Sequence, residues 1–493
     1  MIINLHTDKI EDYERFLQIK KLPRYSFVGT TAWFPDEYAA EVGLGHVEPD
    51  RPAFRPWPGL FDYQRALAAH AIRKQKFCVF ADCGLGKTFI LSEFARYTST
   101  LPGNGRTLII SPLMVVGQTI SEIETFYRGE LTIDRVAAKD LQAWLNGAGG
   151  RLGITNYDAL KDELEPGLLH SLVLDESSML KSHYGKWGTT CIRLGKGLSY
   201  KLACTGTPAP NDRIEFANHA VFMDAFPTVN AFLARFFVNR GQTDNRWEIK
   251  PHAIGPFYRA LSDWSIFLTN PATYGFTDNT KPLPPIEVHE HHIGLTEEQQ
   301  DLAFERTGSL FADQVGGITS RSVLSQIAKG SYKGRDVESL KPAWIRDFID
   351  GLDGESIIVW CKYNREQEIL LQHVPEAASI DGSTPIDVRE RLIDDFKSRR
   401  RKVLISKPSV LGFGLNLQVA TRQIFSGLED SYESYYQAVK RSNRYGSRKP
   451  LHVHIPYTDL EKPMIENVLR KARRVEQDTR EQEIMFHEQS LRF

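Results

Sequence analysis

A glycine-rich segment, ADCGLGKT (81–88), contains residue types that can bind a chain of phosphates. Gly84 and Gly86 allow backbone amides to close around phosphate oxygens, and Lys87 can reach the β- and γ-phosphates. The hydroxyl group of Thr88 can bind Mg²⁺. An apolar run precedes the segment and a helical pattern follows it, which is the context that a phosphate-binding loop requires. Residues 81–88 are therefore predicted to bind ATP with Mg²⁺.

Two adjacent acids, Asp175 and Glu176, end the apolar run SLVLDE (171–176). By itself, such a run more often marks a strand that ends in a solvated turn. A phosphate-binding loop, however, needs an acidic strand end to hold its metal ion, so the loop upstream favours a catalytic pair. Asp175 is then predicted to hold Mg²⁺ through water, while Glu176 orients and deprotonates the attacking water.

Short β-rich runs alternate with helical patterns in two stretches of the chain, which is typical of parallel α/β sheets. In the first stretch, the predicted strands are 77–81, 107–111, 152–157, 171–176 and 200–206. In the second stretch, they are 356–362, 402–406, 422–427 and 451–457. Each candidate catalytic segment of the first stretch therefore lies at the carboxyl end of a strand, where ligands of such sheets bind.

The sequence predicts five parts. Aromatic-rich helical patterns separate the two α/β stretches, and a proline-rich connector, NTKPLPPIEV, leads toward the second. The predicted parts are an N-terminal accessory segment (1–55), an ATP-binding lobe (56–211), a helical insert (212–285), a linker and helical region (286–340) and a second lobe (341–493).

The phosphate-binding loop, the acid pair and the motifs that follow them along the chain resemble those of the superfamily 2 helicases. The resemblance is strongest to the Swi/Snf-type DNA translocases, including compact bacteriophage-encoded versions. The resemblance covers roughly residues 56–480 and implies two RecA-like lobes. In the first lobe, it implies an adenine-reading amide at Gln64. It also implies DNA-backbone contacts at Ser111, Pro112, Asn156 and Tyr157, and a role in coupling ATP hydrolysis to movement for Thr205, Gly206 and Thr207.

The second lobe carries the remaining motifs of the resemblance. Its implied DNA contacts are Gly382, Ser383, Thr384 and Asn416, and its implied ATP contacts are Gly414 and Gln437. In YYQAVKRSNRYGS, the resemblance implies that Arg441 and Arg444 reach the γ-phosphate when the lobes close. Their spacing of three residues predicts that both guanidinium groups lie on one face of a helix.

The sequence departs from the family pattern at several positions. Ser177 and Ser178 replace the usual Ala-His after the acid pair, so coupling is expected to run differently here. The stretch from Ser406 to Asn416 is one residue longer than the usual motif V. The Trp-x-Pro before the arginine motif is absent, and Ser447 stands in place of its closing glutamine.

Three further segments allow two interpretations each. HEHH (289–292) suggests zinc, but no second cluster of Cys or His is visible nearby, which favours a solvated strand. KSRRRK (397–402) is equally consistent with binding nucleic-acid phosphates and with a basic helix end. Aromatic residues between 221 and 267 could stack on bases, but their helical spacing favours packing in the core.

Composition places few limits on function. The formal net charge is −1, so charge neither favours nor excludes a nucleic-acid partner. The five cysteines form no CxxC pair and are expected to be reduced. The chain starts without a signal-peptide pattern, and no apolar run approaches the roughly 18 residues needed to span a bilayer. A soluble, cytoplasmic protein of a bacterium or a phage-infected cell is expected.

Together, these features predict an ATP-dependent translocase on double-stranded DNA. Its cofactors are expected to be ATP and Mg²⁺, and its partner double-stranded or branched DNA, bound by a monomer through phosphates. Two alternatives stay open. One is a strand-separating or branch-migrating DNA helicase, and the other is a nucleotide-gated DNA-binding protein without turnover.

Overall fold

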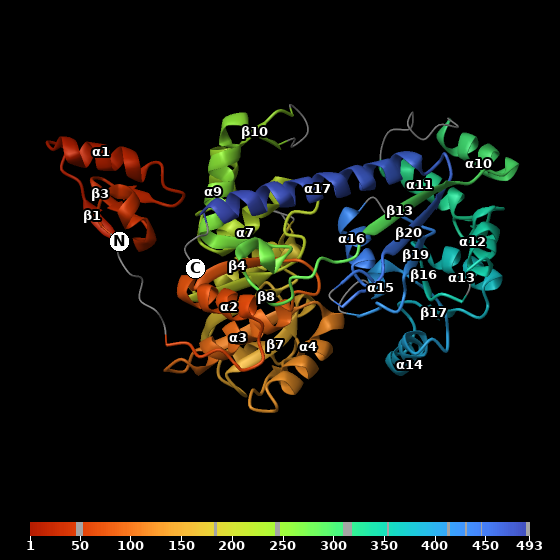
Figure 1. Cartoon of the computed structure of the whole chain (residues 1–493), viewed down its shortest axis with the longest axis horizontal. Helices are drawn as coiled ribbons and strands as arrows, with labels where there is room; N and C mark the ends of the chain where they lie inside the picture. The colour runs from red at the N-terminus through yellow and green to blue at the C-terminus, as the bar shows by residue number, and fades with distance from the viewer. Residues whose placement is uncertain are drawn as a thin grey trace. The chain divides into compact units, whose positions relative to one another are not determined.

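The computed structural model describes residues 1–45, 53–181, 185–241, 247–308, 318–352, 354–411, 415–428, 431–444 and 446–489. The chain divides into two compact units. Unit 1 is Met1–Thr280 with Asp478–Phe493, and unit 2 is Lys281–Gln477. Each unit is built around its own parallel sheet, so the predicted fold of two α/β lobes is confirmed (Figure 1).

The sheet of unit 1 has seven parallel strands within the described residues. Their order is β12 (Ser265–Leu268), β4 (Lys76–Ala81), β9 (Tyr200–Cys204), β8 (Leu169–Asp175), β5 (Arg106–Ser111), β7 (Leu152–Asn156) and β6 (Asp134–Arg135). Because all strands run the same way, the ends of β4, β5, β8 and β9 meet at one edge of the sheet. The candidate catalytic segments therefore come together there.

Alternate residues of these strands build two cores, one on each face of the sheet. On one face, Val79 and Val173 pack with helices α2 (Asp62–Lys74) and α3 (Lys87–Thr100). On the other face, Phe80, Leu108 and Leu174 pack with α6 (Lys186–Gly195), α7 (Phe216–Phe222) and α9 (Ile254–Trp264). In Figure 1, α2 and α3 lie on one side of β4 and β8, and α7 and α9 lie on the other. The helices thus fix the strand ends from both sides.

The predicted helical insert belongs to this core. Its strand β12 pairs with β4, and the structure therefore places part of residues 212–285 in the sheet of unit 1. Most aromatic side chains of the insert are buried, as their spacing predicts; the buried ones include Phe222, Phe232, Phe236, Phe237, Tyr258 and Trp264. These rings pack in the core and present no surface for stacking on bases.

The N-terminal segment forms a small three-stranded antiparallel sheet in the order β1 (Ile2–Asn4), β3 (Thr31–Trp33) and β2 (Ser26–Val28). Helices α1 (Ile10–Ile19) and η1 (Asp36–Val42) complete it around a core of its own. The Tyr38 hydroxyl group donates a 2.7 Å hydrogen bond to the buried carboxylate of Asp263 on α9. Lys74 of α2 lies 3.5 Å from the same carboxylate. This buried group joins the accessory segment to the rest of unit 1.

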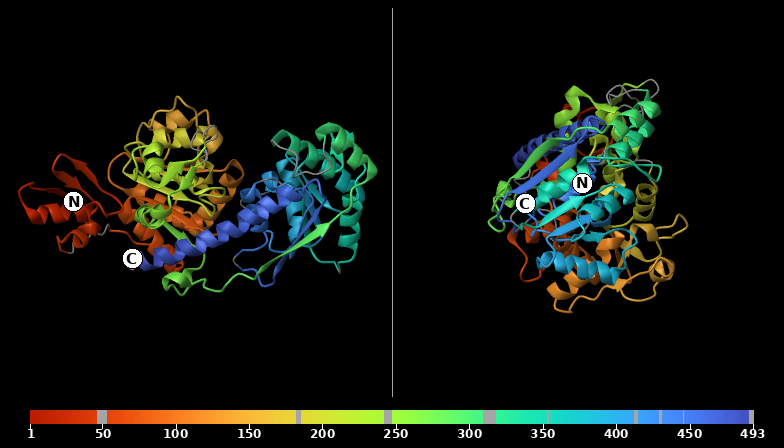
Figure 2. Two further views of the ribbon diagram at one scale, coloured as in Figure 1. Left: turned by 90° about the horizontal axis from the view of Figure 1, so that it is seen from above. Right: turned by 90° about the vertical axis from the view of Figure 1, so that its right-hand side faces the viewer.

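Unit 2 has six parallel strands within the described residues. Their order is β13 (Ile286–His292), β20 (Leu451–Tyr457), β19 (Arg422–Phe425), β16 (Ile357–Trp360), β18 (Val403–Ser406) and β17 (Ala378–Ile380). The edge strand β13, green in Figure 2, lies in the predicted linker region, and the structure makes it part of the second sheet. One face packs on α12 (Lys341–Asp350) and α13 (Asn364–His373), and the other on α16 (Tyr432–Val439) and α17 (Lys462–Gln489).

The remaining elements connect these layers. In unit 1 they are α4 (Leu113–Phe126), α5 (Leu141–Leu145), η2 (Tyr157–Ala159), η3 (Ser177–Leu180), η4 (Arg213–Glu215), α8 (Val229–Phe236), β10 (Phe237–Asn239), β11 (Trp247–Ile249), η5 (Pro251–Ala253) and η6 (Pro271–Tyr274). In unit 2 they are α10 (Glu297–Thr307), α11 (Ile318–Ala328), β14 (Ser331–Tyr332), β15 (Arg335–Asp336), α14 (Ile386–Lys397) and α15 (Pro408–Leu411). Within the described residues, none of the helices has the length and apolar character of a membrane span.

A buried ionic cluster ties the helices of unit 2 to its sheet. Glu461, which directly precedes α17, lies 2.6 Å from the ammonium group of Lys329 and 2.5 Å from that of Lys341. All three side chains are buried, and Lys341 also donates to the carbonyl oxygen of Ser426 at 3.1 Å. Burial alone would raise the pKa of Glu461, but the two lysines outweigh it and lower the pKa to about 2. Glu461 therefore stays ionised in the folded protein.

Glu461→Gln should destabilise unit 2 by about 3–5 kcal/mol at pH 7, because it leaves two buried lysines without their carboxylate. The contribution of Glu461 is present above its ordinary pKa of 4.5 and is lost as the pH falls toward about 2. Urea unfolding at pH 7 and at pH 3 should therefore show a smaller difference between the variant and the wild type at pH 3. Glu466→Gln, at an exposed position of α17, is the matched control. Equal stability of both variants at pH 7 would contradict this role.

Candidate nucleotide site

The phosphate-binding loop connects β4 to α3, as predicted. Gly84 and Gly86 have positive φ angles of 87° and 69°, which glycine adopts without steric cost. A side chain at position 86 would also lie 2.3 Å from the amide nitrogen of Gln64. The loop can therefore keep this path only with glycine at position 86. Helix α3 starts at Lys87, so the free backbone amides of its first turn lie at the end of the loop, where they can bind phosphate.

Gln64 holds this loop from the first turn of α2. Its Oε1 accepts a hydrogen bond from the backbone amide of Phe61 at 3.0 Å. Its Nε2 donates to the carbonyl oxygen of Leu85 at 3.2 Å, and the Tyr63 hydroxyl group donates to the same oxygen at 2.9 Å. The predicted adenine-reading amide is thus buried and bonded to the loop in this structure. Its contact with the base stays a prediction.

Lys87 lies at the centre of the loop. Its ammonium group donates to the carbonyl oxygens of Ala81 at 3.0 Å and Asp82 at 3.4 Å. Burial lowers the pKa of Lys87, but the nearby Cys83, Glu176, Asp82 and Asp175 together outweigh this and raise the pKa. Lys87 therefore carries a full positive charge. The phosphate oxygens of a bound nucleotide can replace the two carbonyl oxygens as acceptors of its hydrogen bonds.

Asp175 ends the central strand β8 and accepts hydrogen bonds from two sides. The Ser111 hydroxyl group, at the end of β5, donates to its Oδ2 at 2.8 Å, and the backbone amide of Glu176 donates to its Oδ1 at 3.0 Å. The Tyr157 hydroxyl group donates to the Asp175 carbonyl oxygen at 2.8 Å. Burial and the neighbouring Glu176 raise the pKa of Asp175 to about 7. The site is therefore built to receive a cation beside this carboxyl group.

Glu176 has an unusual backbone. Its φ and ψ angles of 48° and 54° lie in the left-handed region, which costs energy for a residue with a side chain. The strand therefore stops at Asp175. The hydroxyl group of Thr205, which follows β9, donates to Glu176 Oε2 at 3.3 Å, and the backbone amide of Thr207 donates to the Thr205 hydroxyl group at 3.2 Å. The predicted coupling segment, Thr205 to Thr207 with Gly206 between them, thus contacts the acid pair directly.

A histidine that the sequence analysis missed lies beside the acid pair. His219 of α7 is buried, and its Nε2 lies 3.0 Å from the Ser177 hydroxyl oxygen. Burial lowers the pKa of His219 to about 4, so the ring is neutral at pH 7. His219 is 42 residues from Ser177 along the chain, and no local motif marks it. An imidazole from a helix of the insert thus lies next to Ser177.

Three of the predicted DNA contacts in unit 1 are buried in this structure. The side chains of Ser111 and Tyr157 are buried and bonded to Asp175, and Pro112 is buried as well. Ser111 and Tyr157 thus hold Asp175 in place. The DNA contacts of all three residues stay predictions. The fourth, Asn156, caps η2, because its Oδ1 accepts a hydrogen bond from the Ala159 amide at 3.1 Å.

The predicted DNA contacts of unit 2 lie in loops at the surface. Asp381 follows β17, and its Oδ1 accepts hydrogen bonds of 2.8 to 3.0 Å from the amides and hydroxyl groups of Ser383 and Thr384. Gly382 and Ser383 are exposed. Asn416 is exposed too, and its Nδ2 donates to Gln418 Oε1 at 3.1 Å. These positions are accessible, and their DNA contacts stay predictions.

The two arginines do not lie on a helix, contrary to the prediction from their spacing. Helix α16 ends at Val439, and the next amides form tighter turns: Arg441 donates to the Ala438 carbonyl oxygen and Ser442 to that of Val439. The Arg441 carbonyl oxygen accepts a hydrogen bond from the Leu417 amide at 3.0 Å. The guanidinium groups still converge: Arg441 and Arg444 each donate to the Leu415 carbonyl oxygen, at 3.5 and 3.3 Å. Gln437 is buried on α16. Gly414 lies outside the described residues.

The residues predicted to hold Mg²⁺ have suitable chemistry. Thr88, in the first turn of α3, and Asp175 offer oxygen atoms, which are the ligands that Mg²⁺ prefers. Each carboxylate oxygen of Asp175 accepts one hydrogen bond and keeps a further lone pair. Unit 1 therefore fits a magnesium-bound triphosphate.

Two protein families match this chain. The family described as SNF2-related domain matches residues 63–302, and the family described as Helicase conserved C-terminal domain matches residues 340–446. The first match covers the sheet of unit 1 and continues into unit 2, and the second lies in unit 2. Together they span most of the chain.

Relatives extend the same similarity. Protein p41 of Acyrthosiphon pisum secondary endosymbiont phage 1 is 24% identical over 81% of this chain and 92% of its own length. The ATP-dependent DNA helicase DDM1 of Arabidopsis thaliana is 24% identical over 75% of this chain, which spans 55% of that protein. Among solved structures, the Sulfolobus solfataricus SWI2/SNF2 ATPase core in complex with dsDNA is 20% identical, with a TM-score of 0.41, over 84% of this chain and 90% of that chain.

The family matches agree with the order of the motifs along the sequence. They also agree with the two parallel sheets and with the contacts between the phosphate-binding loop, the acid pair and the segment around Thr205 in unit 1. The chain therefore belongs to the Snf2-type ATPases of helicase superfamily 2.

Proposed function

We propose that this chain is an ATP-driven translocase on double-stranded DNA that remodels DNA or protein–DNA complexes. The observation that carries the proposal is the hydrogen bond from Thr205 to Glu176, because it links the candidate water-activating group to the segment implied to couple hydrolysis to movement. The name of the relative DDM1, a DNA helicase, supports DNA as the partner.

The proposed chemistry follows from the residues of unit 1. Lys87 neutralises charge on the β- and γ-phosphates, and Thr88 and Asp175 hold Mg²⁺, which supplies further charge neutralisation. Glu176 accepts the proton of the attacking water. Its carboxylate is held by Thr205 on one side, so a shift of the coupling segment would change its position.

In unit 2, we propose that Arg441 and Arg444 supply positive charge to the γ-phosphate during turnover. Their convergence on the Leu415 carbonyl oxygen supports joint action, since it holds the two guanidinium groups close together. The planar guanidinium group suits bidentate contact with phosphate oxygens.

The test of the proposed function is steady-state ATP turnover with plain duplex, single-stranded and branched DNA, and with RNA. The proposal expects the largest stimulation with duplex DNA, together with ATP-dependent displacement of a triplex-forming strand, which reports translocation. Unwinding of a plain duplex would favour the strand-separating helicase. ATP-dependent DNA binding without stimulated turnover would favour the nucleotide-gated binding protein, and either outcome would overturn the proposal.

Glu176→Gln should keep the affinity for ATP and lower DNA-stimulated turnover by roughly 10²–10⁴-fold, since only proton transfer from water is lost. Equilibrium binding of a fluorescent ATP analogue and a phosphate-release assay measure the two effects separately. The control is Glu163→Gln, which changes an exposed glutamate of the same unit. Turnover of Glu176→Gln at the wild-type rate would refute the assigned role.

The Ser177–His219 contact should connect the acid pair to α7. Ser177→Ala and His219→Phe are each expected to lower DNA-stimulated turnover several-fold, and the double variant should lose little more than the worse single variant. A double-mutant cycle on kcat/KM should give a coupling of at least about 0.5 kcal/mol. Circular dichroism checks that each variant is folded. Additive losses would show that the two residues act independently.

A further inference from the structure

Histidines from two neighbouring strands gather at the edge of the sheet of unit 2. Strand β13 pairs with β20 in parallel, with Glu287 opposite His452 and His289 opposite His454. Since side chains alternate along a strand, Glu287, His289 and His291 lie on one face of β13. His452 and His454 lie on the same face of β20. The second histidine cluster that the sequence did not reveal beside HEHH is therefore on β20, more than 150 residues downstream.

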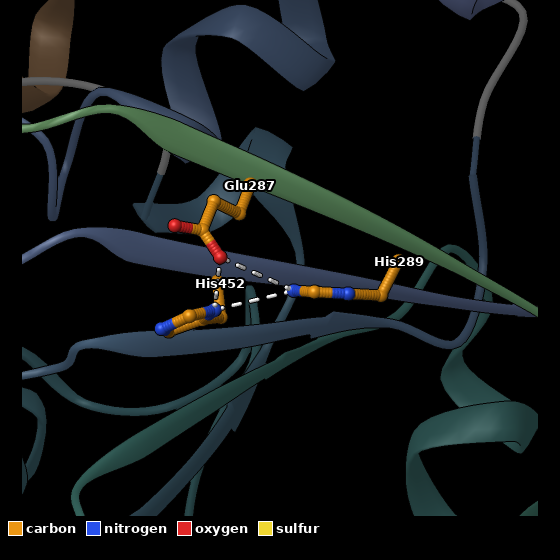
Figure 3. Close-up of side chains that lie close together, drawn as sticks. All are labelled: Glu287, His289 and His452. Carbon is orange, nitrogen blue, oxygen red and sulfur yellow. Dashed lines mark hydrogen bonds and ion pairs between the residues drawn. The ribbon is translucent and has the colours of Figure 1, made fainter.

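Three ligand atoms of this group converge, as Figure 3 shows. His289 Nε2 lies 3.2 Å from His452 Nδ1, and His452 Nδ1 lies 3.2 Å from Glu287 Oε2. The third distance, between His289 Nε2 and Glu287 Oε2, is 4.0 Å. Within the part of the chain that the structure describes, these side chains form a group whose ligand atoms all lie within 4.8 Å of one another.

We propose that Glu287, His289 and His452 bind one Zn²⁺ ion, which clips the edge strand β13 to β20. Zinc bound to nitrogen and oxygen at about 2.0–2.1 Å in a tetrahedral site has ligand atoms about 3.3–3.4 Å apart. Two of the three observed distances lie within about 0.2 Å of this spacing, and the third needs a small side-chain rotation. Two imidazoles and one carboxylate form a known zinc-binding set, with water in the fourth position.

Hydrogen bonding alone does not account for the three contacts. The Nδ1 atom of His452 can carry one proton or one lone pair, and it faces both an imidazole nitrogen and a carboxylate oxygen. A proton there can point well at one of these neighbours, and a proton shared between both bonds each of them only weakly. The other contact then brings two electron pairs together, whereas a cation at the centre attracts all three atoms.

The surroundings support the orientation of the ligands. The His289 ring stacks on His454, with centroids 4.8 Å apart and planes 17° apart. His454 is buried, its Nδ1 lies 3.1 Å from His291 Nε2, and its Nε2 lies 3.4 Å from a guanidinium nitrogen of Arg422. His454 therefore holds the ring of His289 and is not a fourth ligand. Such outer contacts are typical of metal sites.

A metal clip suits the position of β13 in the fold. The strand follows the proline-rich connector, lies at the edge of the sheet and pairs with β20 alone within the described residues. Most of its side chains are exposed, so few apolar contacts hold it. A zinc ion would add bonds between the two strands. This inference is independent of ATP binding and of the proposed function.

The test uses the full chain, purified without a histidine tag and freed of metal with a chelator. Titration with Zn²⁺ should show one ion per chain with a micromolar or lower Kd, and Co²⁺ should give the intense visible absorption of a tetrahedral site. At a hundredfold excess of Zn²⁺ over Kd, the melting temperature of unit 2 should rise by roughly 5–10 °C.

Three variants remove one ligand each: Glu287→Gln, His289→Gln and His452→Gln. Each should weaken Zn²⁺ binding by at least about tenfold and abolish the tetrahedral Co²⁺ spectrum. The control is His373→Gln, at an exposed histidine of α13 in the same unit, which should bind as the wild type does. Because one of the three positions is exposed and the other two are half-buried, metal-free melting should confirm that the variants fold.

Failure of the wild type to bind Zn²⁺ would overturn the proposal. Equal affinities in His289→Gln and His373→Gln would also overturn it, because the ion would then bind elsewhere. Duplex-stimulated ATP turnover of the metal-free protein is measured in parallel, so that a failure of the proposed function is seen separately.

Discussion

The buried carboxyl group of Asp175 is the constraint on which the nucleotide site depends. A carboxylate in a protein interior must be matched by donors or by a cation, because its desolvation is costly. Ser111 at the end of β5 and the Glu176 amide supply donors, and Tyr157 fixes the adjoining carbonyl group. Three neighbouring strand ends, of β5, β7 and β8, are thereby held in one arrangement around the position where a metal ion would bind.

A second constraint of the same kind acts in unit 2. Lys329, directly after α11, and Lys341, the first residue of α12, are buried between strands β13 and β16 in the sequence, and both depend on Glu461 for their negative partner. The ionic cluster also places α12 against the sheet face that carries His291 and His454, since Trp344 of α12 lies 4.8 Å from the His291 ring. Buried charge therefore orders both units, although the residues concerned in unit 2 belong to no recognised motif.

The sequence allowed correct prediction of the parallel sheets and of the segments that end at their carboxyl edges, because these depend on local patterns. Strand runs such as SLVLDE and the glycine loop can each be recognised from a pattern of fewer than ten residues.

Contacts that join distant segments could not be predicted from the sequence. His219 reaches Ser177 from an insert helix, and β12 joins the first sheet from a stretch predicted as helical. The helical prediction for Arg441 and Arg444 was wrong because α16 ends at Val439 and the chain continues in turns, where the Arg441 carbonyl oxygen pairs with the distant Leu417 amide. Ser111 and Tyr157 matched a DNA-contact motif, yet their burial is set by packing that no spacing rule contains.

The left-handed backbone at Glu176 has a consequence for engineering this protein. Replacing a residue of positive φ by glycine removes about 1–3 kcal/mol of backbone strain, which is partly offset by the greater freedom of the unfolded chain. Lys333, in the turn between β14 and β15, and Arg399 after α14 also have positive φ, and both offer this gain away from the nucleotide site. At position 176, the same replacement would relax the backbone and delete the only side chain that Thr205 contacts in the acid pair. A stability screen that ranks positions by backbone strain alone would therefore choose Glu176→Gly, a substitution that is expected to remove activity.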